Sequence, residues 1–381
     1  MRFESLLDAT LDELNAASLL REPDDGSARR GVAAAAERLG LALLDASSND
    51  YLGFAARSVS RETLASPGAG ASRLVHGSAA QHLKLESELS SWVDAESALL
   101  FSSAYAANVG LLSALGVPGS LILSDAANHA SIIDGARLSK ADVRIVPHLS
   151  VTALRAALEN QGAARACWVV TESYFSMDGD GPDLPALRAL CDQYDACLIV
   201  DEAHALGVFG PRGSGRCAES GVKPDILVGA LGKAVGTHGG FVAGSQRLRS
   251  FLWNKARSFV FSTAPSPRLA ELSTTHVQLV READTLRSAL ASNAVRLRTE
   301  LLEAGLSLAR GSFGPIVSVI LGDNPRALTA AERLRSVGIL AQAIRPPTVP
   351  IGSARLRLTV KATFSPTEIA RLAHEVIAAC E

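Results

Sequence analysis

The sequence predicts an α/β protein built on a mostly parallel sheet, and two observations support that prediction. Between residues 99 and 244, short apolar runs alternate with amphipathic stretches. Runs that are apolar on both faces are typical of strands covered by helices on each side. An alternation of such strands with helices is typical of a parallel sheet in an α/β layer structure.

Four of the seven apolar runs in this region end at a polar residue, as a strand does when it reaches the edge of a sheet. Between the runs, apolar residues recur three and four positions apart, as in Leu187, Leu190 and Tyr194, which predicts helices. The predicted strands are Ala98–Phe101, Leu121–Leu123, Val143–Val146, Cys167–Val170, Cys197–Val200, Ile226–Val228 and Phe241–Ala243.

The pattern changes after Pro267, where a long helical stretch is predicted from Leu269 to about Ala304. Shorter strands and helices then alternate, which predicts a smaller α+β domain. The predicted elements are a strand at Ile316–Leu321, a helix at Leu328–Val337, strands at Leu340–Ile344 and Leu356–Thr359, and a helix at Ile369–Cys380.

The N-terminal region predicts a helix at Phe3–Leu20 followed by a polar loop at Glu22–Arg30. We therefore expect three segments along the chain. They are an N-terminal helix and loop segment over residues 1–45, a large α/β domain over 46–275, and a small C-terminal α+β domain over 276–381.

Composition argues against several classes of function. The 37 basic and 39 acidic residues give a net charge of -2, which disfavours nucleic acid or an anionic membrane as a partner. No apolar run approaches the roughly 20 residues that cross a bilayer, and no secretory leader is evident. The five cysteines lack metal-ligand spacing, so we expect no metal and a reduced, cytoplasmic protein.

Ionisable side chains gather where the predicted strands end. In an open α/β sheet, ligands bind beyond the carboxyl ends of the strands. Four strand ends contribute together, which is a stronger signal than any single residue. The residues are Asp125 and His129, Glu172 and Ser176, Asp201 and His204, and Lys233.

One four-residue motif also occurs in another class of protein. Asp-Glu-Ala-His at residues 201–204 is spelled as in ATP-driven helicases, where the carboxylates serve Mg²⁺ and water. That interpretation needs an upstream phosphate loop, G-x-x-x-x-G-K-[ST], and the chain has none, because Ala234 follows Lys233 and both lie downstream. An ATP-dependent nucleic-acid motor is therefore a remote alternative.

A lysine paired with an aspartate supports a different function, which needs fewer assumptions than the helicase interpretation. Lys233 is one of only six lysines and sits in an apolar, glycine-rich stretch from Ile226 to Gly236. Burial there favours the nucleophilic free amine, which forms a Schiff base with an aldehyde such as pyridoxal phosphate. That cofactor needs a carboxylate opposite its pyridine nitrogen, and Asp201 suits this role, although an aspartate after a strand also serves as a helix N-cap.

The chain resembles the α-oxoamine synthases, which are pyridoxal-phosphate enzymes of fold type I. The resemblance implies that fold, with residues 46–275 as the cofactor-binding domain, and it covers nearly the whole chain. The segments that carry it are Ser47–Gly53, Thr171–Asp180, Val200–His204, Leu231–Lys233 and Arg355–Thr359.

The segment Ala343–Pro350 looks characteristic of the biotin-pathway branch of that family. The resemblance then implies an acyltransferase that condenses L-alanine with a pimeloyl thioester, carried on coenzyme A or acyl carrier protein. The products are 8-amino-7-oxononanoate, CO₂ and the free thiol. The nearest alternative is a sister synthase that uses glycine or serine and another acyl thioester.

The resemblance implies catalytic roles for three residues. Lys233 is the Schiff-base lysine, Asp201 pairs with the pyridinium nitrogen, and His129 stacks on the ring and helps to fix the incoming carboxylate. His204 and Ser176 are expected to hydrogen-bond the cofactor's phenolic oxygen, although Ser176 also suits a simple turn.

Further cofactor and substrate residues follow from the same resemblance. Ala104 and Tyr105 offer backbone N–H groups to the cofactor phosphate at a helix N-terminus. Ser262 and Thr263 resemble hydroxyls supplied by a neighbouring subunit, which implies a homodimer with a shared site. The expected substrate residues are Arg357 (with Arg355 as its nearest competitor) for the alanine carboxylate, Asn49, Thr348, and Arg21 for the far carboxylate of the pimeloyl chain.

The sequence also departs from the family pattern. Ala230 stands where a serine or threonine usually helps to hold the phosphate, and Ala104 stands where glycine is usual. Phe364 replaces a frequent histidine, and Ala69 and Ala71 interrupt a stretch that is usually richer in glycine. These departures concern cofactor affinity, and they leave open a pseudoenzyme that keeps the fold without the cofactor.

Overall fold

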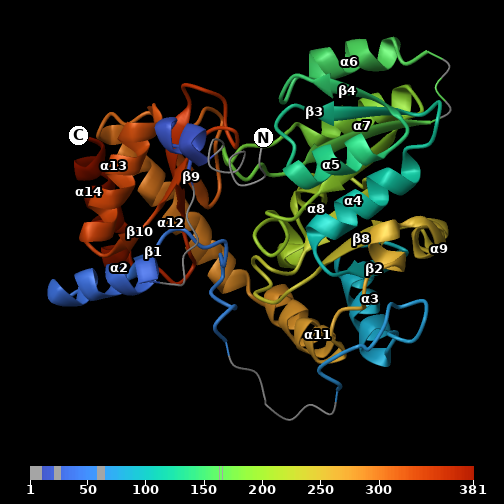
Figure 1. Ribbon diagram of the computed structural model, residues 1–381, viewed down its shortest axis with the longest axis horizontal. Helices are drawn as coiled ribbons and strands as arrows, with labels where there is room; N and C mark the ends of the chain where they lie inside the picture. Colours follow the sequence, from blue (N-terminus) through green and yellow to red (C-terminus); the bar gives the residue numbers. More distant parts are fainter. Residues whose placement is uncertain (1–10, 21–26, 58–64, 163, 165) are drawn as a thin grey trace. The chain divides into compact units, whose positions relative to one another are not determined.

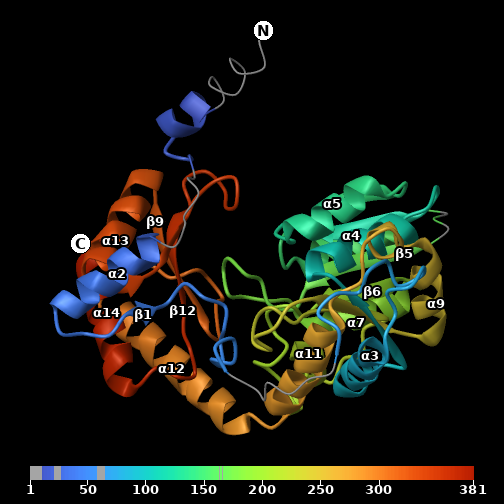
Figure 2. The ribbon, with the colours of Figure 1, turned by 60° about the horizontal axis from the view of Figure 1, so that its bottom comes forward.

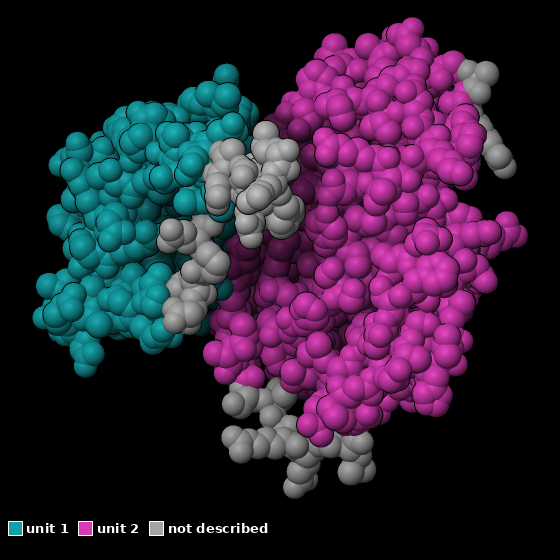
Figure 3. Space-filling view, viewed as in Figure 1, with its two compact units in different colours: residues 1–48, 177–179, 289–381 teal, residues 49–176, 180–288 magenta. Residues whose placement is uncertain are grey.

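The computed structural model describes residues 11–20, 27–57, 65–162, 164 and 166–381. The chain divides into two compact units (Figure 3). Unit 1 comprises residues 1–48, 177–179 and 289–381, and unit 2 comprises residues 49–176 and 180–288.

Unit 2 is built on a seven-stranded sheet with the strand order β2-β8-β7-β6-β5-β3-β4 (Figure 1). Strands β7, β6, β5, β3 and β4 pair in parallel, whereas β8 is antiparallel to both of its neighbours. The predicted mostly parallel sheet and all seven predicted strands are confirmed. Their bounds are β2 Ser97–Phe101, β3 Leu121–Asp125, β4 Asp142–Val146, β5 Cys167–Glu172, β6 Cys197–Asp201, β7 Ile226–Ala230 and β8 Gly240–Gly244.

Helices cover both faces of this sheet because successive strand residues point to opposite sides. Ile122 belongs to the core under one face, whereas Leu121 and Leu123 belong to the core under the other. The first core is covered by α4 (Ala104–Leu115), α5 (Ala130–Leu138), α9 (Gln246–Lys255) and α10 (Arg257–Val260). The second is covered by α6 (Val151–Glu159), α7 (Leu184–Gln193) and the short α8 (Arg216–Glu219).

The edge strand β4 departs from the prediction that every strand is buried on both faces. Ile145 at its centre is 61% exposed, and only Val146 is buried. An edge strand has a neighbour on one side only, so the apolar run from Val143 to Val146 gains less cover than the central strands.

The predicted long helix from Leu269 to Ala304 is two helices, α11 (Pro267–Arg281) and α12 (Asp284–Glu303). The Arg287 side chain donates hydrogen bonds to the carbonyl oxygens of Val280 (2.6 Å) and Arg281 (3.4 Å). These bonds satisfy carbonyl groups that the end of α11 leaves without helical partners. α11 lies beside α3 (Ala80–Trp92), as Figures 1 and 2 show.

Unit 1 contains a three-stranded antiparallel sheet in the order β11-β12-β9. Helix α13 (Asn324–Ser336) packs on this sheet and α14 (Pro366–Cys380) packs on α13 (Figure 2). The predicted α+β elements of this region are confirmed, and the strands are β9 Ile316–Gly322, β11 Gln342–Ile344 and β12 Ala354–Thr359.

One predicted strand of unit 1 is divided. The stretch Leu340–Ile344 contributes to β10 (Ile339–Leu340), which pairs in parallel with β1 (Leu44–Asp45), and to β11, which pairs with β12. A break at Ala341 is needed because the two halves hydrogen-bond to different partners.

The N-terminal predictions are partly outside the described residues. Residues 11–16 are helical, and the rest of the predicted helix at Phe3–Leu20 is either undescribed (residues 3–10) or non-helical (residues 17–20). The predicted loop at Glu22–Arg30 is wrong for its last four residues, because α2 (Ser27–Arg38) begins at Ser27.

The compact units divide the chain at other positions than the predicted boundaries at residues 45 and 275. The N-terminal residues share unit 1 with the C-terminal region, to which the pairing of β1 with β10 joins them. The second division falls between Ser288 and Ala289, within α12. Among helices of the described residues, none is both long and apolar enough to span a membrane.

A buried ion-pair cluster joins the elements of unit 2 around Glu86 of α3. Its carboxylate contacts the guanidinium groups of Arg73 (2.9 Å) and Arg249 (3.0 Å) and accepts the N–H of Leu100 in β2 (3.0 Å). Arg73 and Glu86 are 3% and 4% exposed, so each depends on the other for compensation of its charge.

We predict that Glu86→Ala lowers the free energy of unfolding by about 3–5 kcal/mol, because it leaves a buried guanidinium without its carboxylate. Glu88→Ala in the same helix is the matched control, since Glu88 pairs with Arg281 while 26% of its side chain is exposed. Urea unfolding followed by circular dichroism measures both. Equal losses in the two variants would contradict the prediction.

Candidate active site

Three carboxylates end neighbouring strands at one edge of the unit 2 sheet. Asp125, Glu172 and Asp201 are the last residues of β3, β5 and β6. Glu172 pairs with Asp201 in the strand register, and Asp201 pairs with Val228 of β7. The carboxyl ends of parallel strands therefore bring these predicted groups together, as expected for a ligand site in this sheet type.

Asp201 is 6% exposed and is held by two hydrogen bonds. Its Oδ2 accepts the side-chain N–H of Asn108 in α4 (2.7 Å), and its Oδ1 accepts the backbone N–H of Ala203 (2.8 Å). No α-helix begins at Asp201, so the alternative of a helix N-cap is wrong. Asn108 also donates to Ser131 (2.9 Å), and the sequence analysis assigned it no role.

His204 contacts the segment that carries Asn49. The Tyr51 hydroxyl and His204 Nδ1 are 2.8 Å apart, and both residues are buried. Tyr51 also donates a long hydrogen bond to Asn49 Oδ1 (3.4 Å). The structure therefore joins two predicted site residues, Asn49 and His204, through a tyrosine that the sequence analysis did not single out.

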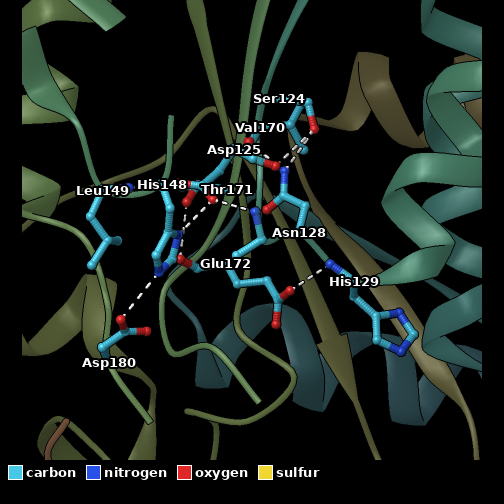
Figure 4. A network of polar contacts seen from close by, with 11 residues as sticks. Ser124, Asp125, Asn128, His129, His148, Leu149, Val170, Thr171, Glu172 and Asp180 are labelled. Atoms are coloured by element: carbon cyan, nitrogen blue, oxygen red, sulfur yellow. Dashed lines mark hydrogen bonds and ion pairs between the residues drawn. The ribbon is translucent and has the colours of Figure 1, made fainter. Parts of the chain in front are cut away.

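His129 caps the N-terminus of α5, where its Nδ1 accepts the N–H of Ser131 (3.2 Å). The backbone N–H of His129 donates to Glu172 Oε1 (2.7 Å), as Figure 4 shows. Loss of water around the ring lowers the pKa of His129, Asp201 acts to raise it, and the charge of Lys233 lowers it further. The lowered pKa favours a neutral imidazole at this position.

Glu172 is 4% exposed and lies close enough to Asp201 and Lys233 for their charges to act on it. Burial and the charge of Asp201 raise the pKa of Glu172 to about 8, against the opposing effects of Lys233 and the His129 N–H. The raised pKa favours the protonated form of Glu172 beside the Asp201 carboxylate.

Lys233 is half-buried in a tight turn that follows β7. The turn is closed by hydrogen bonds from Leu231 N–H to the Gly239 carbonyl (2.9 Å) and from Gly236 N–H to the Lys233 carbonyl (2.9 Å). The charge of Lys233 acts on both His129 and Glu172, which places its amine in the same group of side chains.

The N-terminus of α4 lies against the end of β8. Ser103 caps the helix by accepting the N–H of Ala106 (3.0 Å). A Cβ atom added to Gly240 would lie 2.2 Å from the Ala104 nitrogen, so only glycine permits this approach. Gly240 pairs with Ala230 in the sheet. Ala230 therefore lies next to the N-terminus of α4, which is predicted to bind the cofactor phosphate.

Tyr105 is the second residue of this helix and is 46% exposed. Its hydroxyl donates to Asp134 of α5, and that hydrogen bond raises the pKa of Tyr105. Its ring lies edge-on to His129, with centroids 6.4 Å apart. Ala104, Tyr105 and His129 therefore belong to one group of residues.

Ser262 and Thr263 lie in the segment that follows α10. Thr263 forms a β-bridge with Ser72, and the next residue, Ala264, donates its N–H to the Ala71 carbonyl (3.0 Å). The role of Ser262 and Thr263 toward a neighbouring subunit stays a prediction.

A turn after β5 carries Ser176. The turn is closed by a hydrogen bond from the Phe175 N–H to the Asp180 carbonyl (2.9 Å). The His148 imidazole lies between two carboxylates, with Nδ1 2.7 Å from Asp125 and Nε2 3.1 Å from Asp180 (Figure 4). Burial acts to lower the pKa of His148, but the hydrogen bonds and charges of the two carboxylates raise it to about 10.

Two of the predicted substrate residues, Arg357 and Thr348, lie in the described part of unit 1. Arg357 is 4% exposed in β12 and donates to Thr359 (3.0 Å). Arg355, its competitor, forms an ion pair with Asp178, so its guanidinium is already engaged. Thr348 is exposed after β11, and Arg21 lies outside the described residues.

The Asp-Glu-Ala-His string does not form a magnesium site. Glu202 is fully buried, and its carboxylate accepts the backbone N–H groups of Arg216 (2.9 Å) and Cys217 (2.7 Å). The second carboxylate of the string thus holds a loop in place. Among the described residues, no group of three or more His, Cys, Asp or Glu side chains is arranged to hold a metal ion.

Comparison with known proteins shows the family to which the chain belongs. Residues 42–376 match the family described as aminotransferase class I and II. A serine palmitoyltransferase solved with PLP (pyridoxal 5'-phosphate) is 28% identical, with a TM-score of 0.85 over 94% of this chain and 98% of that chain. The chain belongs to this family and is a PLP-dependent transferase of fold type I, so the nucleic-acid motor is wrong.

Its relatives point to one branch of the family. The 8-amino-7-oxononanoate synthase of Acidithiobacillus ferrooxidans (strain ATCC 53993 / BNL-5-31) is 40% identical over 376 residues, which cover 96% of each chain. The solved 8-amino-7-oxononanoate synthase of Francisella tularensis is 25% identical, with a TM-score of 0.76 over 88% of this chain and 97% of that chain.

The residues present fit PLP. The N–H groups at the start of α4 have no acceptor within the helix, and helix N-termini favour a phosphate. Asp201 supplies a buried carboxylate for a protonated ring nitrogen, and Lys233 supplies the amine. Ala230 offers no hydroxyl beside the phosphate position, so cofactor affinity depends more on the backbone groups.

We predict that Gly240→Ala weakens PLP binding at least about tenfold, because the added methyl group displaces the first turn of α4 from its N–H geometry. Absorbance titration with PLP measures the dissociation constant. Gly68→Ala is the matched control, since a Cβ atom there meets nothing within 4 Å. The prediction fails if both variants bind PLP like the parent.

Proposed function

We propose that this protein catalyses the decarboxylative condensation of L-alanine with a pimeloyl thioester. The products are 8-amino-7-oxononanoate, CO₂ and the free thiol, a step of biotin biosynthesis. The observation that carries the proposal is the 40% identity to an 8-amino-7-oxononanoate synthase over 96% of both chains. The convergence of Lys233, Asp201, Glu172 and His129 at one sheet edge supports it.

Bound PLP supplies an electron sink for negative charge that develops at the α-carbon of the amino acid. Lys233 holds the cofactor aldehyde and, once released, moves the proton at that α-carbon. The Asp201 carboxylate keeps the ring nitrogen protonated, and Asn108 keeps that carboxylate oriented through a 2.7 Å hydrogen bond. His204, held by Tyr51, and Ser176 hydrogen-bond the phenolic oxygen.

His129 and Arg357 orient the amino acid. A neutral imidazole can stack on a protonated ring without charge repulsion, which the lowered pKa of His129 favours. Arg357 binds the alanine carboxylate with its planar fork of N–H groups. Asn49 and Thr348 are proposed near the substrate, and Arg21 for the far carboxylate of the pimeloyl chain.

A second candidate is a sister synthase that uses serine or glycine. The similarity to serine palmitoyltransferase, with a TM-score of 0.85, favours that alternative on backbone geometry. The residues proposed to hold PLP are shared by both candidates, so the identity of the amino acid must be tested directly.

We further propose that the enzyme acts as a cytoplasmic homodimer, with Ser262 and Thr263 reaching the phosphate of the neighbouring subunit. Phe261, beside them, is 72% exposed, so this segment is accessible to a second copy of the chain. Coenzyme A and acyl carrier protein are both candidate carriers of the pimeloyl group.

The function predicts a covalent cofactor on one lysine. Borohydride reduction of the purified protein, followed by peptide mapping, should place the PLP adduct on Lys233, and Lys233→Ala should lose the absorbance of the attached cofactor. With L-alanine and pimeloyl-CoA, mass spectrometry should detect 8-amino-7-oxononanoate, and glycine or serine should yield far less condensed product.

An adduct on another lysine would refute the assignment of Lys233. Equal turnover with serine would favour the sister synthase. Absence of bound PLP and of every condensation product would identify a pseudoenzyme.

We predict that Arg357→Lys raises the KM for L-alanine about 10- to 100-fold, because lysine cannot replace a bidentate pair with a carboxylate. Steady-state kinetics at saturating pimeloyl-CoA measure KM and kcat separately. Arg335→Lys in α13 is the control, since 41% of the Arg335 side chain is exposed. An unchanged KM would assign the carboxylate to another residue.

A further inference from the structure

His148 connects two parts of unit 2 that are distant in the sequence. It follows β4 and lies between the end of β3 and the turn after β5. Figure 4 shows its ring between the carboxylates of Asp125 and Asp180, which come from these two elements. No step of the proposed reaction uses any of these three residues.

The Asp125 end of this connection is fixed. Asp125 Oδ1 accepts the N–H of Ala127 (2.8 Å) as well as His148, and its Oδ2 accepts the N–H of Leu149 (3.0 Å). Leu149 has φ of +55°, a conformation that side chains rarely adopt and that persists where surrounding contacts hold it. Asp125 thus holds both the imidazole and the backbone beside it.

The other end of the connection holds a turn. Asp180 closes the turn by accepting the Phe175 N–H at its carbonyl (2.9 Å), and its carboxylate contacts His148 Nε2 (3.1 Å). The Phe175 ring meets the His148 ring edge-on, with centroids 4.5 Å apart at 89°. His148 therefore contacts both closing residues of the turn, and Ser176 lies directly inside it.

Charge explains why a histidine suits this position. A protonated imidazole donates from both ring nitrogens, one to each carboxylate. The pKa of about 10 keeps the ring charged at neutral pH, so its two donors persist. A neutral side chain here would leave Asp125 and Asp180 facing each other across the gap with no cation between them.

We infer that His148 is a positioning residue, which fixes the turn carrying Ser176 by bonding Asp125 and Asp180 at once. The inference rests on the proposed function for one link, namely that the Ser176 hydroxyl meets the phenolic oxygen of PLP. A hydroxyl can direct a hydrogen bond only where its backbone is held, and the contacts of His148 with Asp180 and Phe175 hold this backbone where the turn closes.

The first test measures the turn itself, in the full chain as purified. Amide hydrogen exchange of a peptide that spans residues 173–183 should be at least about tenfold faster in His148→Gln than in the parent. Asp180→Asn breaks the opposite end and should have the same effect. Unchanged exchange in both variants would overturn the inference, whatever the fate of the proposed function.

The second test is a double-mutant cycle on PLP affinity and on the absorbance of the bound cofactor. Ser176→Ala and His148→Gln should each weaken PLP binding several-fold, as expected for the loss of about one hydrogen bond. The combined variant should bind PLP no more weakly than Ser176→Ala alone, because both changes remove the same contact. If the combined variant lost PLP affinity by the product of the two single-variant factors, the inference would be overturned.

Two control variants separate positioning from general destabilisation. His374→Gln changes an exposed histidine of α14 and should alter neither readout. Asp225→Asn weakens the contacts of a carboxylate that pairs with Arg188 (2.7 Å) and accepts the Leu198 N–H (2.7 Å) at the start of β6. If Asp225→Asn moved exchange in the turn and the cofactor absorbance as His148→Gln does, a merely structural role would replace the inference.

The results also distinguish this inference from the proposed function. A parent protein that binds PLP but condenses no alanine would contradict the function and leave the cycle interpretable. A parent that condenses alanine while Ser176→Ala binds PLP normally would contradict the role of Ser176 and with it the inference, and it would leave the proposed reaction standing.

Discussion

A carboxylate that ends a strand inside a protein needs hydrogen-bond donors, and the rest of the site depends on how Asp201 obtains them. One donor, Asn108, belongs to α4, and the N-terminus of that helix is the proposed phosphate site. Helix α4 therefore sets the spacing between Asp201, which is the proposed partner of the ring nitrogen, and the proposed phosphate site. Gly240 lets that helix approach the sheet closely enough for both contacts.

The sheet of unit 2 could be predicted from the sequence because its signal is local. A strand buried on both faces must be apolar throughout, and the helices between strands must be amphipathic. One error falls where structure depends on distant partners, because the division of the predicted Leu340–Ile344 strand depends on two different neighbours. The break between α11 and α12 is local, since Arg287 bonds to carbonyl groups six and seven residues before it.

The same distinction holds for the site. Asp201, His204 and Lys233 could be proposed because they follow strands and match family motifs, and the structure gathers Asp201 and Lys233 around Glu172. Tyr51 lies in the Ser47–Gly53 motif, but its partner His204 is 153 residues away in the sequence. Asn108 had no motif, and it meets Asp201 across 93 residues. Sequence spacing cannot show such pairs.

The loop that follows Asp201 has a further consequence for how the protein meets its cofactor. Glu202 clamps that loop through two backbone N–H groups, and a Cβ atom on Gly215 would lie 2.5 Å from its carboxylate. A segment held this way loses little conformational entropy when a ligand arrives. The backbone beside Asp201 is therefore ordered by the protein's own contacts, and cofactor binding has little of it left to order.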